Sequence, residues 1–204
     1  MPPLKLYYVP GFCSLAIHIV MRELGMDFTL VKVDMQTKQT AQGEDFLRIN
    51  PKGQVPYLLA DDGMGLSEGP VIAQYLADRL IDTPLLPKAG TMRRYRVMEW
   101  QAYVASEIHK AYTPLFHPTI AADDKALFAK ILRTRYQWID GVLAREMYLT
   151  GSSFTLADAY LFAVTRWAGY VGLDLAGLTH LQDFMGRVAA RPQVIQALQA
   201  ENQV

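Results

Sequence analysis

Residues 5–14 read Lys5-Leu6-Tyr7-Tyr8-Val9-Pro10-Gly11-Phe12-Cys13-Ser14, a strand-like run that turns at Pro10-Gly11 and then opens a helix. A second strand-like run, residues 28–33, follows that helix, and a strand-helix-strand unit of this length closes as a right-handed parallel crossover. The turn leaves Cys13, the only cysteine of the chain, at the helix start. Composition favours a small buried hydrophobe at this position. The position itself favours a reactive thiol, because a helix N-terminus stabilises the thiolate.

The following residues continue this alternation of strands and helices. Asp62-Gly63 is a hairpin signal, so the run after it should pair antiparallel with the run before it. The expected elements are strands over residues 4–9, 28–33, 55–59 and 64–67, helices over 14–24 and 70–80, a loop over 35–43 and a short helical piece over 44–49. They predict a mixed sheet with covering helices, and this element order with a thiol at the first turn describes a thioredoxin-like domain.

The pattern changes at residues 82–90, which carry two prolines and a glycine. Beyond them the apolar residues follow the helical period, with a capping-box-like helix start at Thr155 and Asp158. The expected helices cover residues 91–111, 123–145, 156–170 and 178–190. We therefore predict an α/β plus all-α fold, with an N-terminal thioredoxin-like domain over residues 1–81, a linker over 82–90 and a C-terminal helical-bundle domain over 91–204.

Charge and composition narrow the classes of function. Lys+Arg and Asp+Glu both number 20 among 204 residues, which excludes a general attraction to nucleic acid or anionic lipid. The one dense basic run, residues 93–96, is interpreted as a solvated or subunit-facing side of a helix. The first residues lack an export-type apolar segment and the apolar runs are short, so we expect a cytoplasmic protein without a membrane span. His18, His117 and His180 lack ligand spacing, so no metal is expected.

Two loops carry features that suit a peptide-like ligand. Residues 50–56, Asn-Pro-Lys-Gly-Gln-Val-Pro, place a proline at the head of a strand. A cis bond there would leave the Val55 N–H and C=O free for a ligand, although cis bonds make up only about 5–6% of X–Pro bonds. Residues 66–70, Leu-Ser-Glu-Gly-Pro, open a helix whose free N–H groups suit a carboxylate, while Glu68 could pair with an ammonium group. Glu68 could equally be a plain first-turn acid that complements the helix dipole.

Five stretches together resemble the bacterial beta-class glutathione S-transferases, and the resemblance spans nearly the whole chain. They are residues 7–14 (YYVPGFCS), 50–56 (NPKGQVP), 67–69 (SEG), 107–110 (EIHK) and 154–160 (FTLADAY). The resemblance implies a homodimer, a thioredoxin-like N-terminal domain, a cis-proline before the third strand, and glutathione bound as co-substrate along the domain interface.

The resemblance also implies which residues serve glutathione. Cys13 lies beside the glutathione sulfur, with which relatives can form a mixed disulfide, and His109 can accept the thiol proton or stabilise the thiolate. The implied glutathione-binding residues are Cys13, Lys38, Val55, Glu68, Gly69, Ser106 and His109, of which Cys13 and His109 are also the implied catalytic residues. Two positions depart from the pattern. Gly69 stands where much of the superfamily has a serine, and Ala102 where close relatives have a ligand-binding asparagine.

The predicted function is activation of the glutathione thiol and its conjugation to small apolar electrophiles, in detoxification or catabolism. Aromatic residues predict an apolar acceptor pocket, while Tyr8 is interpreted as a packing residue; the pocket residues are Phe12, Tyr112, Phe116 and Trp167. Two alternatives remain open. Cys13 could itself carry out glutathione-dependent thiol-disulfide exchange, or the protein could bind ligands on this fold without catalysis.

Overall fold

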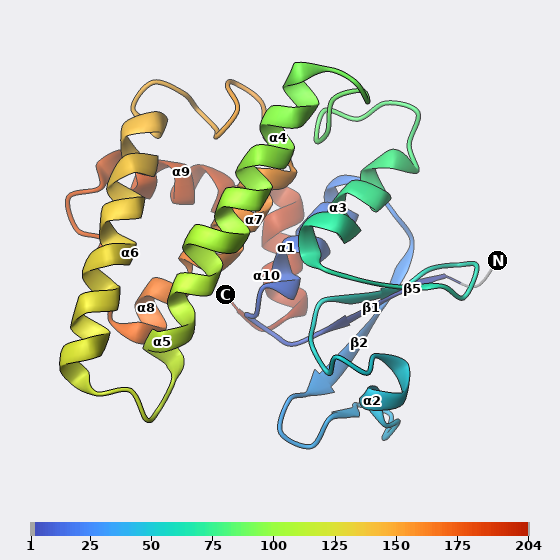
Figure 1. Ribbon diagram of the computed structural model, residues 1–204. Helices are drawn as coiled ribbons and strands as arrows, with labels where there is room; N and C mark the ends of the chain where they lie inside the picture. Colours follow the sequence, from blue (N-terminus) through green and yellow to red (C-terminus); the bar gives the residue numbers. More distant parts are fainter. Residues whose placement is uncertain (1–2, 204) are drawn as a thin grey trace. The chain divides into compact units, whose positions relative to one another are not determined.

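The computed structural model describes residues 3–203, which divide into two compact units (Figure 1). The first unit runs to Thr83 and resumes at Arg191, and the second spans Pro84–Ala190. The domain boundaries given above stay a prediction. The units differ from them in two respects: the second unit begins at Pro84, inside the predicted linker, and the residues from Arg191 onward belong with the first unit.

The first unit is built on a mixed five-stranded sheet. Its elements are β1 (Leu4–Tyr8), α1 (Ser14–Glu23), β2 (Phe28–Asp34), β3 (Gln39–Thr40), α2 (Phe46–Ile49), β4 (Tyr57–Leu59), β5 (Gly65–Ser67) and α3 (Gly69–Asp78). The strand order is β3-β2-β1-β4-β5, with β1 parallel to β2 and the other neighbours antiparallel. The predicted parallel crossover and hairpin are therefore confirmed. The short strand β3 lies inside the segment that the sequence predicts as a loop.

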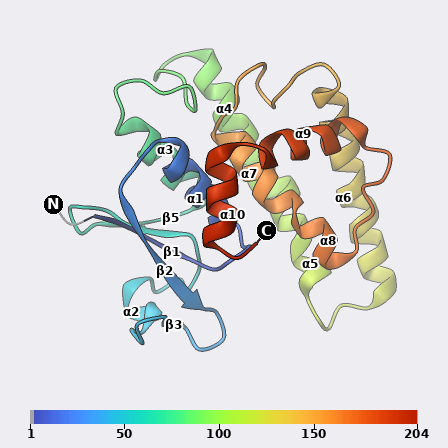
Figure 2. The same cartoon turned by 180° about the vertical axis from the view of Figure 1, so that it is seen from behind.

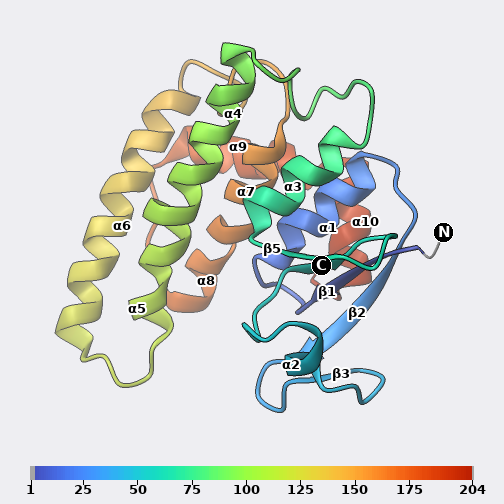
Figure 3. The ribbon, with the colours of Figure 1, turned by 45° about the vertical axis from the view of Figure 1, so that its right-hand side comes forward.

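Both faces of this sheet are covered, which explains why β1 is almost continuously apolar. Figures 1 and 3 show α1 and α3 on one face and α2 on the other. The Tyr8 ring lies 6.4 Å from the ring of His18 on α1, whereas the Tyr7 ring lies 5.6 Å from Phe46 on α2. Tyr8 is buried and thus has the packing position that the sequence predicts.

A helix near the C-terminus, α10 (Pro192–Ala200), lies beside α1 in the first unit (Figure 2). The last helix expected from the sequence ends at residue 190, so α10 is not among the predicted helices. Its buried residues Val194, Ala197 and Leu198 have the spacing of one helix face. At the start of α10, Arg191 forms two hydrogen bonds with the carboxylate of Glu23, at 2.7 and 2.8 Å.

The second unit is helical, and its elements are α4 (Met92–Tyr103), η1 (Val104–His109), η2 (Lys110–Tyr112), α5 (Thr113–Phe116), α6 (Ala122–Leu143), α7 (Leu156–Thr165), α8 (Trp167–Val171) and α9 (Thr179–Ala189). Every residue of α7 is buried, so this helix forms the core of the unit. The helix predicted over residues 91–111 is wrong in its second half, because the backbone widens into the π-helical η1 and then tightens into the 3₁₀-helical η2.

The start of α7 has the predicted capping box. The buried carboxylate of Asp158 accepts hydrogen bonds from the N–H and the hydroxyl of Thr155, at 2.8 and 2.7 Å. Its other oxygen accepts a bond of 2.8 Å from the N–H of Leu149. Asp158 thus fixes both the start of α7 and the chain that precedes it.

Candidate active site

Cys13 occupies the N-cap position of α1 and is partly buried. Its Sγ lies 3.5 Å from the carbonyl oxygen of Val55. The Val55–Pro56 bond is cis, as the resemblance implies. Because a carbonyl oxygen only accepts hydrogen bonds, this contact is one that a thiol makes by donating its S–H and that a thiolate cannot make. The structure therefore places Cys13 where a thiol can donate to Val55, while the position at a helix start favours a thiolate.

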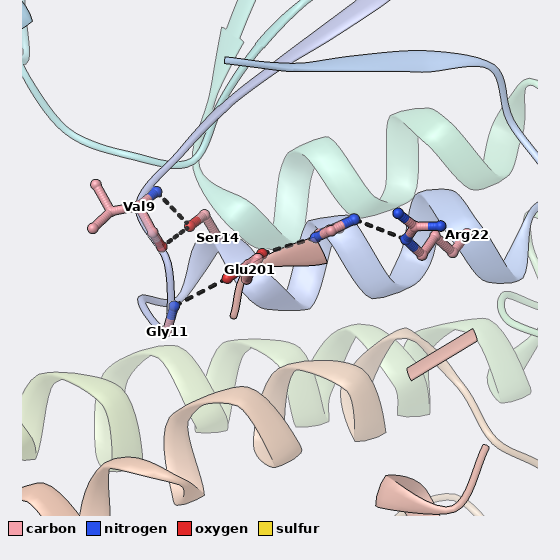
Figure 4. A network of polar contacts seen from close by, with 6 residues as sticks. Val9, Gly11, Ser14, Arg22 and Glu201 are labelled. Carbon is pink, nitrogen blue, oxygen red and sulfur yellow. Dashed lines mark hydrogen bonds and ion pairs between the residues drawn. The ribbon is translucent and has the colours of Figure 1, made fainter. Parts of the chain in front are cut away.

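The turn before Cys13 is held by the side chain of Ser14. Its hydroxyl donates to the carbonyl of Val9 at 3.1 Å and accepts from the Val9 N–H at 3.2 Å (Figure 4). Gly11 in this turn has a φ of +74°, a conformation that side chains disfavour. A Cβ at Gly11 would also stand 2.7 Å from Oε1 of Gln203. Residue 11 is therefore restricted to glycine by its backbone, since the end of the flexible Gln203 side chain can move aside.

A buried chain of polar contacts connects this turn to the C-terminal segment, within the first unit. Glu201 accepts the Gly11 N–H at 3.0 Å and contacts Nδ1 of His18 at 2.8 Å (Figure 4). Arg22 donates from Nε to Nε2 of His18 at 2.8 Å. Since Nε2 accepts, the imidazole proton lies on Nδ1 and points to the Glu201 carboxylate. Sequence reasoning missed this contact, because 190 residues separate Gly11 from Glu201.

Lys38 stands beside the loop that carries Val55. It has a φ of +57°, and its ammonium group donates to the carbonyl of Gly53 at 2.9 Å. Residues in such sparsely populated backbone regions cluster at ligand sites. The loop predicted from residues 35–43 thus brings the Lys38 charge to the segment that precedes the cis-proline.

Glu68 also has a positive φ, of +69°, at the N-cap of α3. Its position at the helix start fits an acid that complements the helix dipole, so this interpretation stays open. The exposed side chain makes no capping hydrogen bond. Instead it pairs with Lys52, whose Nζ lies 3.2 Å from Oε1 of Glu68 and 2.9 Å from Oγ of Ser67. Sequence reasoning missed Lys52, because nothing in its spacing indicates that it reaches Glu68.

Gly69 is the first residue of α3 and leaves space for a side chain. A Cβ there would find Pro56 Cγ as its nearest neighbour, at 3.7 Å, an ordinary van der Waals contact. The glycine at this position is therefore not required by the packing.

In the second unit, His109 ends the π-helical segment η1, and Nδ1 of its ring lies 2.6 Å from the hydroxyl of Tyr160 on α7. Burial lowers the pKa of His109 to about 4, and the positive charge of Lys110 adds to the shift. The imidazole is therefore neutral at physiological pH. Ser106 and Ala102, on the same continuous helical segment, are exposed.

The predicted apolar pocket needs correction at two of its four residues, because Tyr112 and Trp167 are both buried. Tyr112 is fully buried and its hydroxyl lies 2.9 Å from that of Tyr136, so it belongs to the core of the second unit. Phe116 is 48% exposed and packs edge-on against Trp167, with 5.7 Å between the ring centroids. In the first unit, Phe12 is 44% exposed. Phe116 and Phe12 keep the exposure that an acceptor pocket needs.

Residues 3–203 contain no group of three or more histidine, cysteine or acidic side chains arranged to hold a metal ion. None of their helices combines the length and the apolar character that crossing a bilayer requires.

Comparison with known proteins gives matches in both halves of the chain. The family model "Glutathione S-transferase, N-terminal domain" matches residues 2–78, and "Glutathione S-transferase, C-terminal domain" matches residues 103–192. Glutathione S-transferase GstA of Escherichia coli O157:H7 is 49% identical over 97% of this chain and 98% of its own length.

Solved structures agree with these matches. A sphingomonad glutathione S-transferase complexed with glutathione has a TM-score of 0.94 at 42% identity, covering 98% of this chain and 100% of its own. A bacterial beta-class glutathione S-transferase of Sphingomonas chungbukensis has a TM-score of 0.94 at 41% identity, with the same coverage.

Proposed function

Because this chain belongs to the glutathione S-transferase family, and to its bacterial beta class, we propose specific roles for its site residues in the family's reaction. The protein is an enzyme that conjugates glutathione, its co-substrate, to electrophiles. The comparisons favour this activity over disulfide exchange and over ligand binding without catalysis.

In the proposed binding mode, the first unit holds the glutathione backbone. The Val55 N–H makes no hydrogen bond within residues 3–203 and is the partner for the cysteinyl group. Glu68 takes the γ-glutamyl ammonium group, next to the Gly69 N–H, which takes the carboxylate. Lys38 takes the glycine carboxylate. Two of these residues, Lys38 and Glu68, have positive φ values, and such strained conformations cluster at ligand sites.

In the proposed reaction the protein forms no covalent bond with either substrate. The glutathione thiol loses its proton to solvent, and the thiolate sulfur attacks the electrophilic carbon. With an aryl halide, a carbon–sulfur bond forms, the carbon–halogen bond breaks, and the halide leaves with the electron pair. Ser106 and His109 are assigned to the same ligand by the resemblance, with His109 near the sulfur. Exposed Phe116 and Phe12 are assigned to the apolar part of the electrophile.

The observation that carries the role of Cys13 is its contact with the Val55 carbonyl, at 3.5 Å. A thiol that donates its proton is a weak nucleophile, because the thiolate is the reactive form. We therefore assign Cys13 as a hydrogen-bond donor: when glutathione binds, its S–H turns from the Val55 carbonyl to the glutathione sulfur, which lowers the pKa of the glutathione thiol. In this role Cys13 does not form a covalent intermediate.

Kinetics of two variants test this role. Cys13→Ser retains a hydrogen-bond donor and should keep aromatic-halide conjugation within about threefold of wild type, since one neutral hydrogen bond contributes about 1 kcal/mol. Cys13→Ala should lose more, and the loss should shrink as the pH rises and free glutathione ionises by itself. Reduction of hydroxyethyl disulfide serves as the contrast. Substantial disulfide turnover that disappears in both variants while conjugation persists would instead make Cys13 a nucleophile.

A homodimeric assembly, a cytoplasmic location and a detoxifying role complete the proposal. Exposed aromatic and aliphatic side chains on α4 and α6 support self-association, because large apolar patches mark interaction surfaces. Tyr95 and Trp138 are examples, and the groove beside Trp138, of about 550 Å³, is lined by Trp100 and Tyr103. Light scattering should give twice the 22.9 kDa chain mass. Trp138→Glu should shift the protein toward the monomer, whereas the matched change Tyr170→Glu on α8 should not.

A further inference from the structure

His109 lies in an aromatic corner formed within the second unit. Its ring meets Tyr160 edge-on, with 5.8 Å between centroids, and meets Trp167 in the same manner at 4.8 Å. Nδ1 lies 2.6 Å from the Tyr160 hydroxyl. Tyr160 and Trp167 are each only 8% exposed, so this corner is largely closed, whereas His109 itself is partly exposed. Nδ1 of the ring thus forms a hydrogen bond with Tyr160 on α7, and Nε2 is the nitrogen that other groups can contact.

Burial, more than the charges around it, keeps the His109 ring neutral. Lys110 follows it directly, and α6 contributes Arg135, which is paired with Glu107 at 2.8 Å. The helix α7 contributes the hydroxyl of Tyr160, while its Asp158 carboxylate accepts hydrogen bonds from Thr155 and Leu149. Burial and Lys110 lower the pKa of His109 to about 4. The neutral ring therefore carries one proton, which lies either on Nδ1 or on Nε2.

The acidities of the two groups distinguish the two positions. Nδ1 of His109 and the Tyr160 hydroxyl form a short contact of 2.6 Å, in which either atom could donate. A phenol is a much stronger acid than a neutral imidazole N–H, which makes the Tyr160 hydroxyl the better donor. The Tyr160 O–H therefore donates to Nδ1, and the proton of the imidazole lies on Nε2.

We propose that Tyr160 is a positioning residue that holds His109 in the Nε2–H tautomer, so that His109 presents a hydrogen-bond donor, and not a base, to an anionic sulfur. The part that concerns sulfur rests on the proposed function, in which His109 serves glutathione. An N–H donor stabilises the thiolate more than the thiol. It cannot accept the thiol proton, which leaves to solvent. The resemblance implies two possible roles for His109, accepting the thiol proton or stabilising the thiolate. The proposal keeps only the second.

The tautomer can be measured without glutathione, by ¹⁵N NMR of the imidazole nitrogens at pH 7. The His109 signals are assigned by their loss in His109→Gln. We expect the wild-type enzyme to show a protonated Nε2 and an unprotonated Nδ1, and Tyr160→Phe to show a mixture of tautomers. Tyr136→Phe is the matched control, because it removes a buried hydroxyl of the same unit that bonds to Thr165 and Tyr112 and not to His109. A protonated Nδ1 in the wild-type enzyme would overturn the proposal.

The second measurement follows thiolate formation in bound glutathione by its ultraviolet absorbance. We expect Tyr160→Phe to raise the pH of half-ionisation by about 0.5–1 unit, which lowers the thiolate fraction about three- to tenfold at acidic pH. The values of kcat should fall with it while KM for glutathione stays within about twofold, and the loss should vanish at high pH. Tyr136→Phe should leave the half-ionisation pH unchanged.

A double variant separates the two proposals. In a His109→Gln background, Tyr160→Phe should have no further effect on thiolate formation, because Tyr160 acts only through His109. An undiminished effect in that background would overturn the positioning role. Normal tautomer fixation without any change in thiolate formation would leave the role of Tyr160 intact and instead remove His109 from the proposed function. Melting temperatures of all variants identify any loss that comes from unfolding.

Discussion

Gly69 illustrates what the sequence can and cannot predict about a single residue of the proposed glutathione site. The resemblance indicates that a serine hydroxyl is missing here, and the sequence cannot say whether the helix start requires the glycine. The structure answers this, because a Cβ would meet only Pro56 Cγ at 3.7 Å. The missing hydroxyl is therefore a loss of one ligand contact and not a consequence of packing.

Gly69→Ser should bind glutathione more tightly than the wild-type enzyme. The serine hydroxyl would donate a hydrogen bond to the charged γ-glutamyl carboxylate. We therefore expect KM for glutathione to fall about three- to tenfold. Gly69→Ala is the matched control, since it adds the same Cβ without the hydroxyl and should leave KM near the wild-type value. Steady-state kinetics with glutathione as the varied substrate measure both. Equal effects of the two variants would refute a hydroxyl contact.

Lys52 and Glu68 show where residue-level prediction ends. Glu68 follows a recognisable motif, and its role could be anticipated from the helix start that follows it. Lys52 lies in another motif, and its ammonium reaches Ser67 and Glu68 only because β4 and β5 pair as a hairpin. The pairing was predicted from Asp62-Gly63, whereas the direction of a long, flexible lysine side chain has no signal in the sequence.

At the scale of elements, local periodicity predicts most strands and helices but not their irregularities. The π-helical turn η1 lies inside a pattern that indicates one uninterrupted helix. Its cause is tertiary, because Arg135 on α6 donates to the carbonyl of Glu107 at 2.7 Å and also pairs with the Glu107 carboxylate. The turn aims His109 at Tyr160, 51 residues away. Such long-range contacts override the helical period, and for this reason the geometry of His109 could not be predicted.

The capping box of α7 predicts a large loss of stability in Asp158→Ala. Three buried donors, from Leu149 and Thr155, would lose their acceptor, which should cost about 2–4 kcal/mol. Thr91→Ala is the matched control, because Thr91 caps the exposed start of α4 and should cost about 1 kcal/mol or less. Thermal melting at pH 7 compares the two. A melting temperature of Asp158→Ala equal to that of Thr91→Ala would contradict the structural role of this carboxylate.

The same carboxylate makes stability depend on pH. Burial raises the pKa of Asp158 to about 6, above its ordinary value of 3.8, so between these values the folded state binds more protons than the unfolded state. Stability from this group is therefore full below about pH 4, falls as the pH rises, and is flat above about pH 6, with a total change of about 3 kcal/mol. Asp158→Asn should remove this slope. Thermal melting across pH 4–7 measures it, and an identical slope in both proteins would show that another group is responsible.

At the scale of the whole molecule, the N-terminal turn and the C-terminal segment depend on each other within the first unit. Figure 4 shows Glu201 beside Gly11, two residues before Cys13. The sequence predicts the turn but not α10 or its partner, because nothing local indicates that residues near 200 return to residues near 11. The carboxylate of Glu201 and the side chain of His18 are fully buried, and each satisfies the other. Buried polar groups of this kind are costly when one partner is removed.

Glu201→Ala should therefore weaken both folding and the site. It removes the carboxylate that accepts from the Gly11 N–H and the His18 Nδ1–H, and we expect a loss of about 3 kcal/mol, or about 6–12 °C in melting temperature for a chain of this size. Because the turn that carries Cys13 loses its anchor, KM for glutathione should rise and the Cys13 thiol should react faster with a disulfide reagent.

Arg191→Ala is the control. It removes the bond to Glu23 at the opposite end of α10, so it should lower stability and leave Cys13 reactivity and KM near wild type. If both variants change Cys13 reactivity equally, the effect comes from loosening α10 as a whole. If only Glu201→Ala changes it, the carboxylate holds the active-site turn directly.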